Sequence, residues 1–535
     1  MELSRALLYF RTISQLRPAQ ILHRVRLRAQ RAVVGRFPDC FEALLTRPAP
    51  SHVGWPNDFV PIDARLSWPS LEELELGKMT LLGQSRNLGS PPRWLDPEVE
   101  QLWRYHLHYW DWAWGLAQEP DRGRARAVFC QLLTSWTDQT HFGRWDEWSP
   151  YVVALRAWSW CGQYDTLVRG SDLEEPFVKA MRLHAKFLKW HLELDVGGNH
   201  LIKNLKALVG LGMFLGDRRL LERAMRSLER EVARQVLPDG GHFELAPAYH
   251  CQVLGDLVDL ERLLGVKCPP WLSVVVPKMR RWLGTVLLPD GTVPLLNDGY
   301  PVDGLLVEAL EPGPPSPPGL TLLPDSGLAV LRRSGLFVLA DVGMPCPDEL
   351  PAHAHADTLG FWFYAGLTQV VGEGGTSTYE AGWVRDYERG TAAHSTVQVD
   401  ATNSTEVWGA FRAARRARPT VLHTNSEDSV IVLTASHDGY RFLRGRPIHT
   451  RTWVLDGTGL RVIDEVDGLG EHDLVVRFHG TPVEAVQTKS GELTERPTQT
   501  AVGWGRRRDS TLLEHAAHAK LPWRFEIVLS AERNE

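Results

Sequence analysis

A segment rich in proline and glycine divides the chain into two parts with different hydrophobic periodicity. The segment Glu311-Pro-Gly-Pro-Pro-Ser-Pro-Pro-Gly319 cannot continue a helix, because proline lacks a backbone N–H and clashes with the preceding turn. Before it, apolar residues recur at spacings of three and four, as in Leu205, Leu208 and Val209. After it, short β-type runs such as 336–341 alternate with Asp-Gly and Gly-Thr turns. The sequence therefore predicts an all-α part followed by an all-β part.

The number and spacing of these elements suggest a more specific architecture. Roughly ten helices of similar length with short connections favour an (α/α) toroid of paired helices. The later runs and turns are typical of an antiparallel β-sandwich. We expect a basic N-terminal helix and connector over 1–60, the toroid over 61–310, a Pro-rich linker over 311–324 and the sandwich over 325–535.

The N-terminal segment is basic although the whole chain carries a net charge of −6. No acidic residue occurs from Leu3 to Pro38, and Arg24, Arg28 and Arg31 recur at helical spacing. This pattern fits peripheral contact with an anionic membrane or an acidic polymer, and equally a solvated helix docked on the main domain. The overall charge gives no reason to expect a nucleic-acid partner.

Several features of the sequence indicate where in the cell the protein is located. No apolar run of about 18 residues is present, so we expect no transmembrane segment. The N-terminus lacks the apolar core and cleavage site of a secretory signal. The six cysteines are scattered without a C-x-x-C pair, which fits a reducing compartment. A cytoplasmic or membrane-peripheral location is favoured, and a periplasmic one stays open.

The densest group of chemically active side chains opens the all-β part. In Pro351-Ala-His-Ala-His-Ala-Asp357, alternate residues His353, His355 and Asp357 share one face of an extended chain. Clustered imidazoles and a carboxylate indicate a metal site, a catalytic site or both. A set of hydrogen-bonded core histidines is the alternative.

Two stretches in the helical part also place polar groups where helices begin. Asn199 can cap a helix that opens with His200. Tyr249 lies in the first turn of a helix that Pro247 begins, where the helix dipole and nearby cations could lower its pKa. A buried tyrosine with an ordinary hydrogen bond is the simpler interpretation.

Seven segments in the same order resemble the heparinase II/III-like polysaccharide lyases, a family with a toroid and a β-sandwich. They are Trp148-Ser-Pro-Tyr-Val-Val-Ala-Leu-Arg156, Gly198-Asn-His-Leu-Ile-Lys-Asn-Leu-Lys-Ala207, Gly240-Gly-His-Phe-Glu-Leu-Ala-Pro-Ala-Tyr-His250, Pro351-Ala-His-Ala-His-Ala-Asp357, Gly375-Thr-Ser-Thr-Tyr379, Thr391-Ala-Ala-His-Ser-Thr-Val397 and Glu406-Val-Trp-Gly-Ala-Phe-Arg412.

The resemblance implies β-elimination at a uronic acid residue of an anionic polysaccharide. It implies that Asn199 and His200 neutralise the uronate carboxylate where enolate charge develops. Tyr249 matches the tyrosine that protonates the departing C4 oxygen, and His353 the histidine that serves as base. Whether Tyr249 or His353 removes the C5 proton depends on syn or anti geometry and is left open. The residues expected to bind the sugar chain are Trp148, Tyr151, Arg156, His250, Arg385 and Arg389.

The resemblance also implies a structural zinc ion in the sandwich, and no organic cofactor. The matching positions are His355, Glu373 and His394, a reasonable zinc shell of two imidazoles and one carboxylate. The family's usual carboxylate is an aspartate, so Glu373 departs from the pattern. We expect such a metal to brace loops, because an elimination needs no activated water.

Two other functions fit the sequence. A glycoside hydrolase on the same toroid would need a carboxylate pair, for which Asp146, Glu147 and Glu244 are the candidates. A non-catalytic factor for exopolysaccharide binding or assembly would also suit the basic N-terminal helix.

Overall fold

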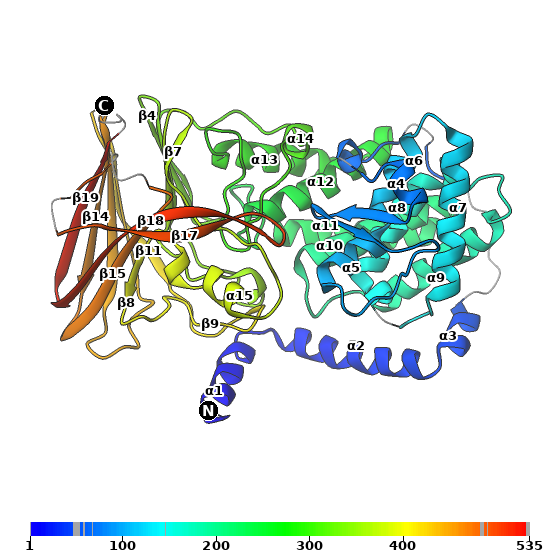
Figure 1. Ribbon diagram of the computed structural model, residues 1–535, viewed down its shortest axis with the longest axis horizontal. Coiled ribbons are helices and arrows are strands. Elements are labelled where there is room, and N and C mark those ends of the chain that lie inside the picture. Colours follow the sequence, from blue (N-terminus) through cyan, green and yellow to red (C-terminus); the bar gives the residue numbers. More distant parts are fainter. Residues whose placement is uncertain are drawn as a thin grey trace. The chain divides into compact units, whose positions relative to one another are not determined.

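The computed structural model describes residues 2–45, 54–56, 59–66, 68–144, 146–427, 429–481, 486–488 and 491–530. The chain forms two compact units, coloured along the sequence in Figure 1. The first unit comprises residues 1–16, 236–251 and 277–535, and the second comprises 17–235 and 252–276. The predicted order of a helical toroid followed by an antiparallel β-sandwich is confirmed. The ends of two long helices, however, belong to the unit that holds the sandwich.

The basic N-terminal segment forms three helices where the sequence suggested one. These are α1 (Glu2–Ile13), α2 (Pro18–Arg36) and α3 (Pro38–Leu45). Each break falls at a proline that begins the next helix, because a residue before proline is disfavoured in the α conformation. The first helix belongs to the first unit, and the other two belong to the second.

The second unit consists mainly of helices joined by short turns. In chain order, the elements here and at its border are α4 (Leu71–Glu75), β1 (Lys78–Leu81), β2 (Gln84–Asn87), α5 (Gln101–Tyr109), α6 (Trp114–Gln118), α7 (Arg122–Gln139), α8 (Pro150–Leu167), α9 (Glu174–Trp190), α10 (Gly198–Phe214), α11 (Arg218–Gln235), α12 (Pro247–Leu264) and α13 (Pro270–Val286). Among the described residues, no helix is both long and apolar enough to span a membrane.

Burial separates an inner from an outer layer of these helices. Buried residues lie on every side of α8 and α10, as expected for helices enclosed by others. In α11 the buried residues Ala224, Leu228 and Val232 follow one stripe, as expected for a helix that covers the outside. The abundant tryptophans serve this packing, and Trp103, Trp110 and several others are fully buried.

The first unit carries the β-structure other than the β1–β2 hairpin, and its described strands are all paired antiparallel. They are β3 (Gly319–Leu323), β4 (Leu328–Arg333), β5 (Leu336–Asp341), β6 (Phe361–Ala365), β7 (Thr368–Val371), β8 (Val397–Val399), β9 (Val407–Trp408), β10 (Arg412–Ala413), β11 (Pro419–Ser426), β12 (Ile431–His437), β13 (Ile448–Leu455), β14 (Gly459–Asp467), β15 (Glu471–His479), β16 (Val486–Thr488), β17 (Thr494–Gly503), β18 (Arg506–Lys520) and β19 (Trp523–Ser530). Two short helices, α14 (Gly304–Ala309) and α15 (Trp383–Glu388), accompany them.

Three sheets of described strands build the sandwich. Their orders are β3–β4–β5–β6–β7, β11–β12–β13–β14–β19–β16 and β17–β18–β15–β8. One buried apolar cluster draws residues from all three, including Val338, Trp453 and Val476. The opposite face of the first sheet packs on the end of α13 through Trp282 and Phe337. Strand β3 lies inside the expected Pro-rich linker, because Gly319–Leu323 pairs with β4.

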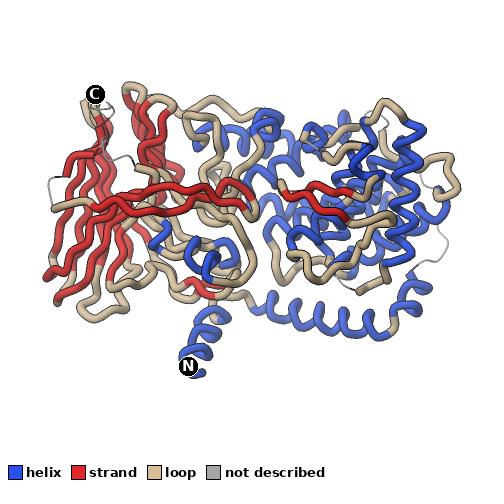
Figure 2. The backbone as a smooth tube through the Cα atoms, viewed as in Figure 1, coloured by secondary structure: helices blue, strands red, loops and turns tan. Residues whose placement is uncertain are grey.

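Strands β17 and β18 form a long twisted ribbon that extends beyond the rest of their sheet (Figure 2). Backbone N–H groups near its tip donate to a neighbouring loop, Ala501 to the carbonyl of Gly374 and Gly505 to that of Ser377, both at 2.8 Å. These contacts fix Trp504, at the turn of the ribbon, against the loop that ends at Tyr379.

Candidate active site

Tyr249 and His353 lie against each other in the first unit. Tyr249 is in the first turn of α12, and His353 ends a short 3-10 turn before β6. Their ring centroids are 4.1 Å apart with the planes inclined by 34°. Both side chains are largely buried. The two groups that the sequence assigned to proton transfer are therefore neighbours.

A buried carboxylate, Asp298, fixes the histidine ring. It accepts hydrogen bonds from His353 Nδ1 and His355 Nε2, each at 2.9 Å, and from the Arg385 guanidinium at 2.5 and 2.9 Å. Burial alone would raise the pKa of Asp298, but Arg385 and the two histidines hold it well below its usual range. Because Nδ1 of His353 donates to this carboxylate, Nε2 is the nitrogen that can accept a proton.

The two phenols of the site stay protonated at neutral pH. The Tyr249 and Tyr379 hydroxyls share a hydrogen bond of 2.5 Å. Burial, then the neighbouring phenol, then Asp298 raise the pKa of Tyr249 well above its ordinary value. Of the two interpretations left open by the sequence, the buried, hydrogen-bonded tyrosine fits better than one with a lowered pKa. Tyr249 is suited to donate a proton.

Aromatic side chains and one carboxylate surround this pair. The Tyr300 ring lies 6.1 Å from that of Tyr249 and 5.2 Å from that of Trp504, which in turn contacts Tyr379 at 4.6 Å. Glu244 places a carboxylate oxygen 3.6 Å from His353 Nε2. Trp504 is partly exposed, so its indole can stack on a sugar ring.

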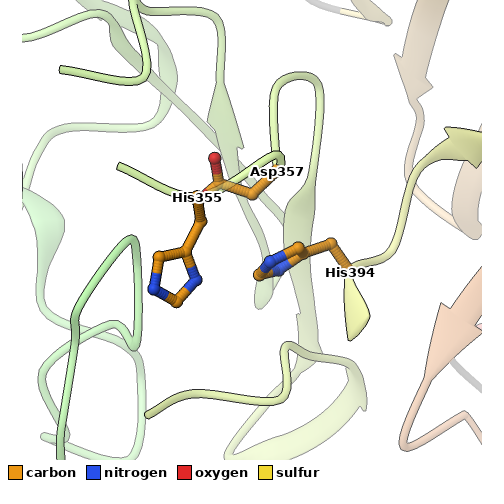
Figure 3. A group of neighbouring side chains, drawn as sticks. All are labelled: His355, Asp357 and His394. Carbon is orange, nitrogen blue, oxygen red and sulfur yellow. The ribbon is translucent and has the colours of Figure 1, made fainter. Parts of the chain in front are cut away.

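His355, Asp357 and His394 form a second cluster (Figure 3). His355 links it to the first group through its hydrogen bond to Asp298. One ligand atom from each residue lies within 4.8 Å of the others, and all three side chains are buried. His355 Nδ1, Asp357 Oδ1 and His394 Nε2 have no hydrogen-bond partner among the residues that the structure describes. Unpaired buried polar atoms are costly, and this donor set suits tetrahedral zinc. The residues present therefore fit the metal that the family resemblance implies.

Glu373, which the sequence suggested as the third ligand, is bonded elsewhere. Its Oε2 accepts from His394 Nδ1 at 2.8 Å, and its Oε1 from the Ser395 N–H at 3.0 Å. The structure thus brings the two predicted histidines together with Asp357. Glu373 holds the His394 ring so that Nε2 faces the cluster.

Asn199 and His200 lie in the second unit, at the start of α10. Gly197 and Gly198 precede them with φ of 71° and 56°, a conformation that glycine adopts without strain. His200 Nδ1 lies 3.1 Å from Glu193 Oε1, and its ring lies 4.3 Å from that of Tyr151. Asn199, His200 and Tyr151 are therefore positioned together within this unit. That they share a site with Tyr249 stays a prediction.

Arg156 was expected to bind the sugar chain, but it is completely buried. Its Nε donates to His184 Nε2 at 3.0 Å and its Nη1 to the His108 carbonyl at 3.2 Å. The guanidinium lies 4.7 Å from the Trp136 ring, and burial lowers its pKa to about 9. Trp148 packs on its other side and lines a cavity of about 680 Å³. Arg156 thus packs behind Trp136 and Trp148, whose rings line this cavity.

Three other predicted sugar-binding residues are also engaged by the protein. Arg385 and Arg389 are buried, and Arg389 donates to the carbonyls of Ala354, Gly409 and Arg412. His250 is buried with Nε2 3.1 Å from the Met279 carbonyl. Because these groups already have protein partners, the structure favours a role in holding loops over direct contact with a sugar.

Sequence reasoning missed three contributors to this arrangement. The sequence analysis named Tyr379 only as the end of a motif and assigned no role to Asp298 or Trp504. Tyr379 carried a usable signal, because it ends one of the motifs on which the family resemblance rests, whereas Asp298 lies in an Asn-Asp-Gly segment far from His353 in the sequence. Trp504 carried none, because its role depends on the length of the ribbon.

Family models match most of the chain. Residues 96–310 match the heparinase II/III N-terminus, and residues 315–526 match the heparinase II/III-like C-terminal domain. The chain belongs to the heparinase II/III-like family. The motif-based resemblance is thereby confirmed.

Solved structures show the same fold. A crystal structure of heparinase III is 15% identical with a TM-score of 0.73, over 94% of this chain and 91% of that one. A mutant of the heparan sulfate lyase HepC from Pedobacter heparinus is 18% identical with a TM-score of 0.62, over 92% and 88%. A curated family relative, FtsZ-localized protein C from Caulobacter vibrioides (strain NA1000 / CB15N), is 24% identical over 87% of this chain and 84% of its own.

Proposed function

We propose that this protein is a polysaccharide lyase that cleaves a uronate-containing polymer by β-elimination. The observation that carries the proposal is the contact between His353, oriented by Asp298, and Tyr249, a phenol held in its protonated form. A base and an acid side by side are what an elimination needs. Membership of the family and the lyase fold of its structural neighbours support the same reaction class.

The roles follow from the hydrogen bonds. His353 Nε2 takes the proton from C5 of the uronate, and the electrons of that C–H bond form the C4–C5 double bond. The C4–O bond breaks, its electron pair stays on oxygen, and Tyr249 protonates that oxygen. Asp298 stabilises the imidazolium that forms, as a buried carboxylate does beside a catalytic histidine. Asn199 and His200 are proposed to hydrogen-bond the uronate carboxylate, which makes the C5 proton acidic.

The position of the two rings also favours one stereochemical course. Because Tyr249 and His353 contact each other, they reach the same side of a bound sugar. This favours syn elimination, in which the C5 hydrogen and the C4 oxygen leave from one face. Glucuronate residues have that arrangement and iduronate residues do not, so glucuronate-type chains are the proposed substrates.

We also propose that His355, Asp357 and His394 hold a zinc ion. When bound, the ion would offset the charge of Asp357 and join the loop before β6 to the loop before β8. Glu373 would act through His394, because its carboxylate fixes the ring nitrogen that faces away from the cluster.

A substrate panel tests the lyase proposal. Alginate, heparan-type chains, hyaluronan and glucuronan would each be incubated with the full chain and scored for unsaturated uronyl ends by ultraviolet absorbance. We expect product from at least one glucuronate-type polymer. Tyr249→Phe should abolish turnover and retain polymer binding. Tyr387→Phe is the control and should be active, because among the described residues the Tyr387 hydroxyl forms a hydrogen bond only with Thr498. A folded protein inert on every polymer would overturn the proposal.

The relative named for FtsZ localisation favours a second candidate, a non-catalytic binding or assembly factor. Under that function, the wild type would bind a polymer without forming unsaturated product, and Tyr249→Phe would bind it equally well. A hydrolase is less well supported, because Asp146 is ion-paired with Arg104 at 2.6 Å and the carboxylates of Glu147 and Glu244 are buried. Reducing ends without unsaturation would identify that reaction.

A further inference from the structure

Helix α2 exposes an apolar ridge to solvent. Leu27 and Val34 face the second unit and are buried. On the opposite face, Leu22, Val25, Ala29 and Ala32 follow one another at spacings of three and four. Leu22 is 67% exposed and Val25 62%, and Ile21 and Val33 beside them are also exposed. We call this set, Ile21, Leu22, Val25, Ala29, Ala32 and Val33, the α2 ridge.

Polar contacts fix the helix so that the α2 ridge faces outward. The Gln20 side chain donates to the Asp195 carbonyl at 3.2 Å, and Arg26 donates to the Leu192 carbonyl at 3.3 Å. Arg24 pairs with the Asp195 carboxylate at 3.5 Å. A surface helix normally turns its apolar stripe to the core and its charges to water. Here an apolar stripe also faces away from the core, which marks an interaction site.

The charges beside the α2 ridge are all positive. Arg24, Arg28, Arg31 and Arg36 are exposed, and no acidic residue occurs in α2. The whole chain has a net charge of −6, so this basic helix contrasts with the rest of the molecule. Its partner is therefore expected to combine negative charge with an apolar phase.

We propose that α2 is an interfacial helix that binds the surface of an anionic lipid bilayer. The α2 ridge would enter the boundary between headgroups and acyl chains, and the arginines would contact lipid phosphates. An acidic polysaccharide would engage the arginines but gives no reason for exposed Leu22 and Val25. A bilayer accounts for both features. The proposal does not depend on the lyase reaction, since no residue of the α2 ridge belongs to the candidate active site.

Vesicle sedimentation of the full chain tests this proposal. The probes are vesicles of phosphatidylcholine alone and of phosphatidylcholine mixed with phosphatidylglycerol. We expect the wild type to bind the anionic vesicles at least about tenfold more tightly, and added salt to weaken that binding. Leu22→Glu with Val25→Glu should reduce the affinity by about tenfold or more. Arg28→Gln with Arg36→Gln should reduce binding to anionic vesicles only.

Val274→Glu is the matched control, because Val274 is 68% exposed elsewhere on the second unit. It should bind like the wild type. Equal binding to both vesicle types, or a ridge variant that binds as well as the control, would overturn the proposal. A third outcome would also overturn it: the wild type does not bind vesicles and is a dimer by light scattering, whereas the ridge variant is a monomer. The α2 ridge would then be an interface between two copies of the chain. Activity on soluble polymer should be equal in all variants, which separates this proposal from the lyase assignment.

Discussion

Arg385 and Asp298 form a bidentate ion pair with no solvent exposure, with Nη1–Oδ1 and Nη2–Oδ2 distances of 2.5 and 2.9 Å. The same carboxylate binds His353 and His355, so one buried charge joins the Tyr249–His353 pair to the cluster of His355, Asp357 and His394. The arginine compensates that charge. The arrangement of both groups of side chains thus depends on Arg385, which need not touch a substrate.

Replacing Arg385 by Gln should destabilise the protein strongly. The change leaves the Asp298 carboxylate buried without its cation, which typically costs about 3–5 kcal/mol. Urea unfolding should show this loss as a lower midpoint. The exposed Arg444 provides the control, and Arg444→Gln should change the free energy of unfolding by less than about 0.5 kcal/mol. Equal midpoints for the two variants would contradict the structural role of the pair.

Replacing Asp298 by Asn should impair catalysis more than binding. The amide has nearly the shape of the carboxylate, but it no longer stabilises a charged His353 imidazole. We expect kcat to fall by about 10²- to 10⁴-fold with little change in KM, measured as the rate of unsaturated product formation. Asp456→Asn, in a turn of the sandwich, is the control. An effect on KM alone would argue against the assigned role.

The metal proposal predicts a specific order among variants. Elemental analysis of the purified full chain should find about one zinc per molecule, and a chelator should lower the Tm. His355→Ala, Asp357→Ala and His394→Ala should each lose the metal. Glu373→Gln should retain it with about 10- to 100-fold weaker affinity. Metal loss in Glu373→Gln together with retention in Asp357→Ala would make Glu373 the ligand.

Buried His184 should make stability depend on pH. Burial first, and then the neighbouring Arg156, lower its pKa to about 3, so the folded state favours the neutral ring. The contribution of the neutral ring to stability is complete above the pKa of histidine in the unfolded chain, near 6.5. It is lost as the pH falls from there towards the folded-state pKa of about 3. His184→Gln keeps an acceptor for Arg156, and should reduce the slope of unfolding free energy against pH by about 1.4 kcal/mol per unit in this window. An unchanged slope between pH 4 and 6 would contradict this expectation.

Local sequence patterns predicted a helix start well where a proline marks it. The helix expected to begin at Pro247 is α12, because a proline start is a local signal. The sequence analysis did not predict the β1–β2 hairpin, since its strands have four residues each and six of the eight residues are polar. The sequence analysis predicted one N-terminal helix instead of three, because its evidence was the run of basic residues and not the positions of Pro18 and Pro38.

The candidate site was predictable in its residue types but not in its connections. His353 and Tyr249 follow from motifs, whereas their link to Asp298 depends on a loop that comes from a distant part of the chain. Arg156, Arg385 and Arg389 have the chemistry of sugar ligands, yet burial assigns them to protein acceptors. Exposure is a property of the whole fold, so a single sequence does not reveal it.

The ribbon of β17 and β18 brings a consequence for how such a site can diversify. Its base is part of the sandwich, while its turn presents Trp504 to the tyrosines of the site. Under the proposed function, a change in the length or residues of that turn would alter the surface that meets a sugar and would leave Asp298 and Arg385 unchanged. Substrate preference and reaction chemistry would then be carried on separate segments of the chain, and each could vary while the other is kept.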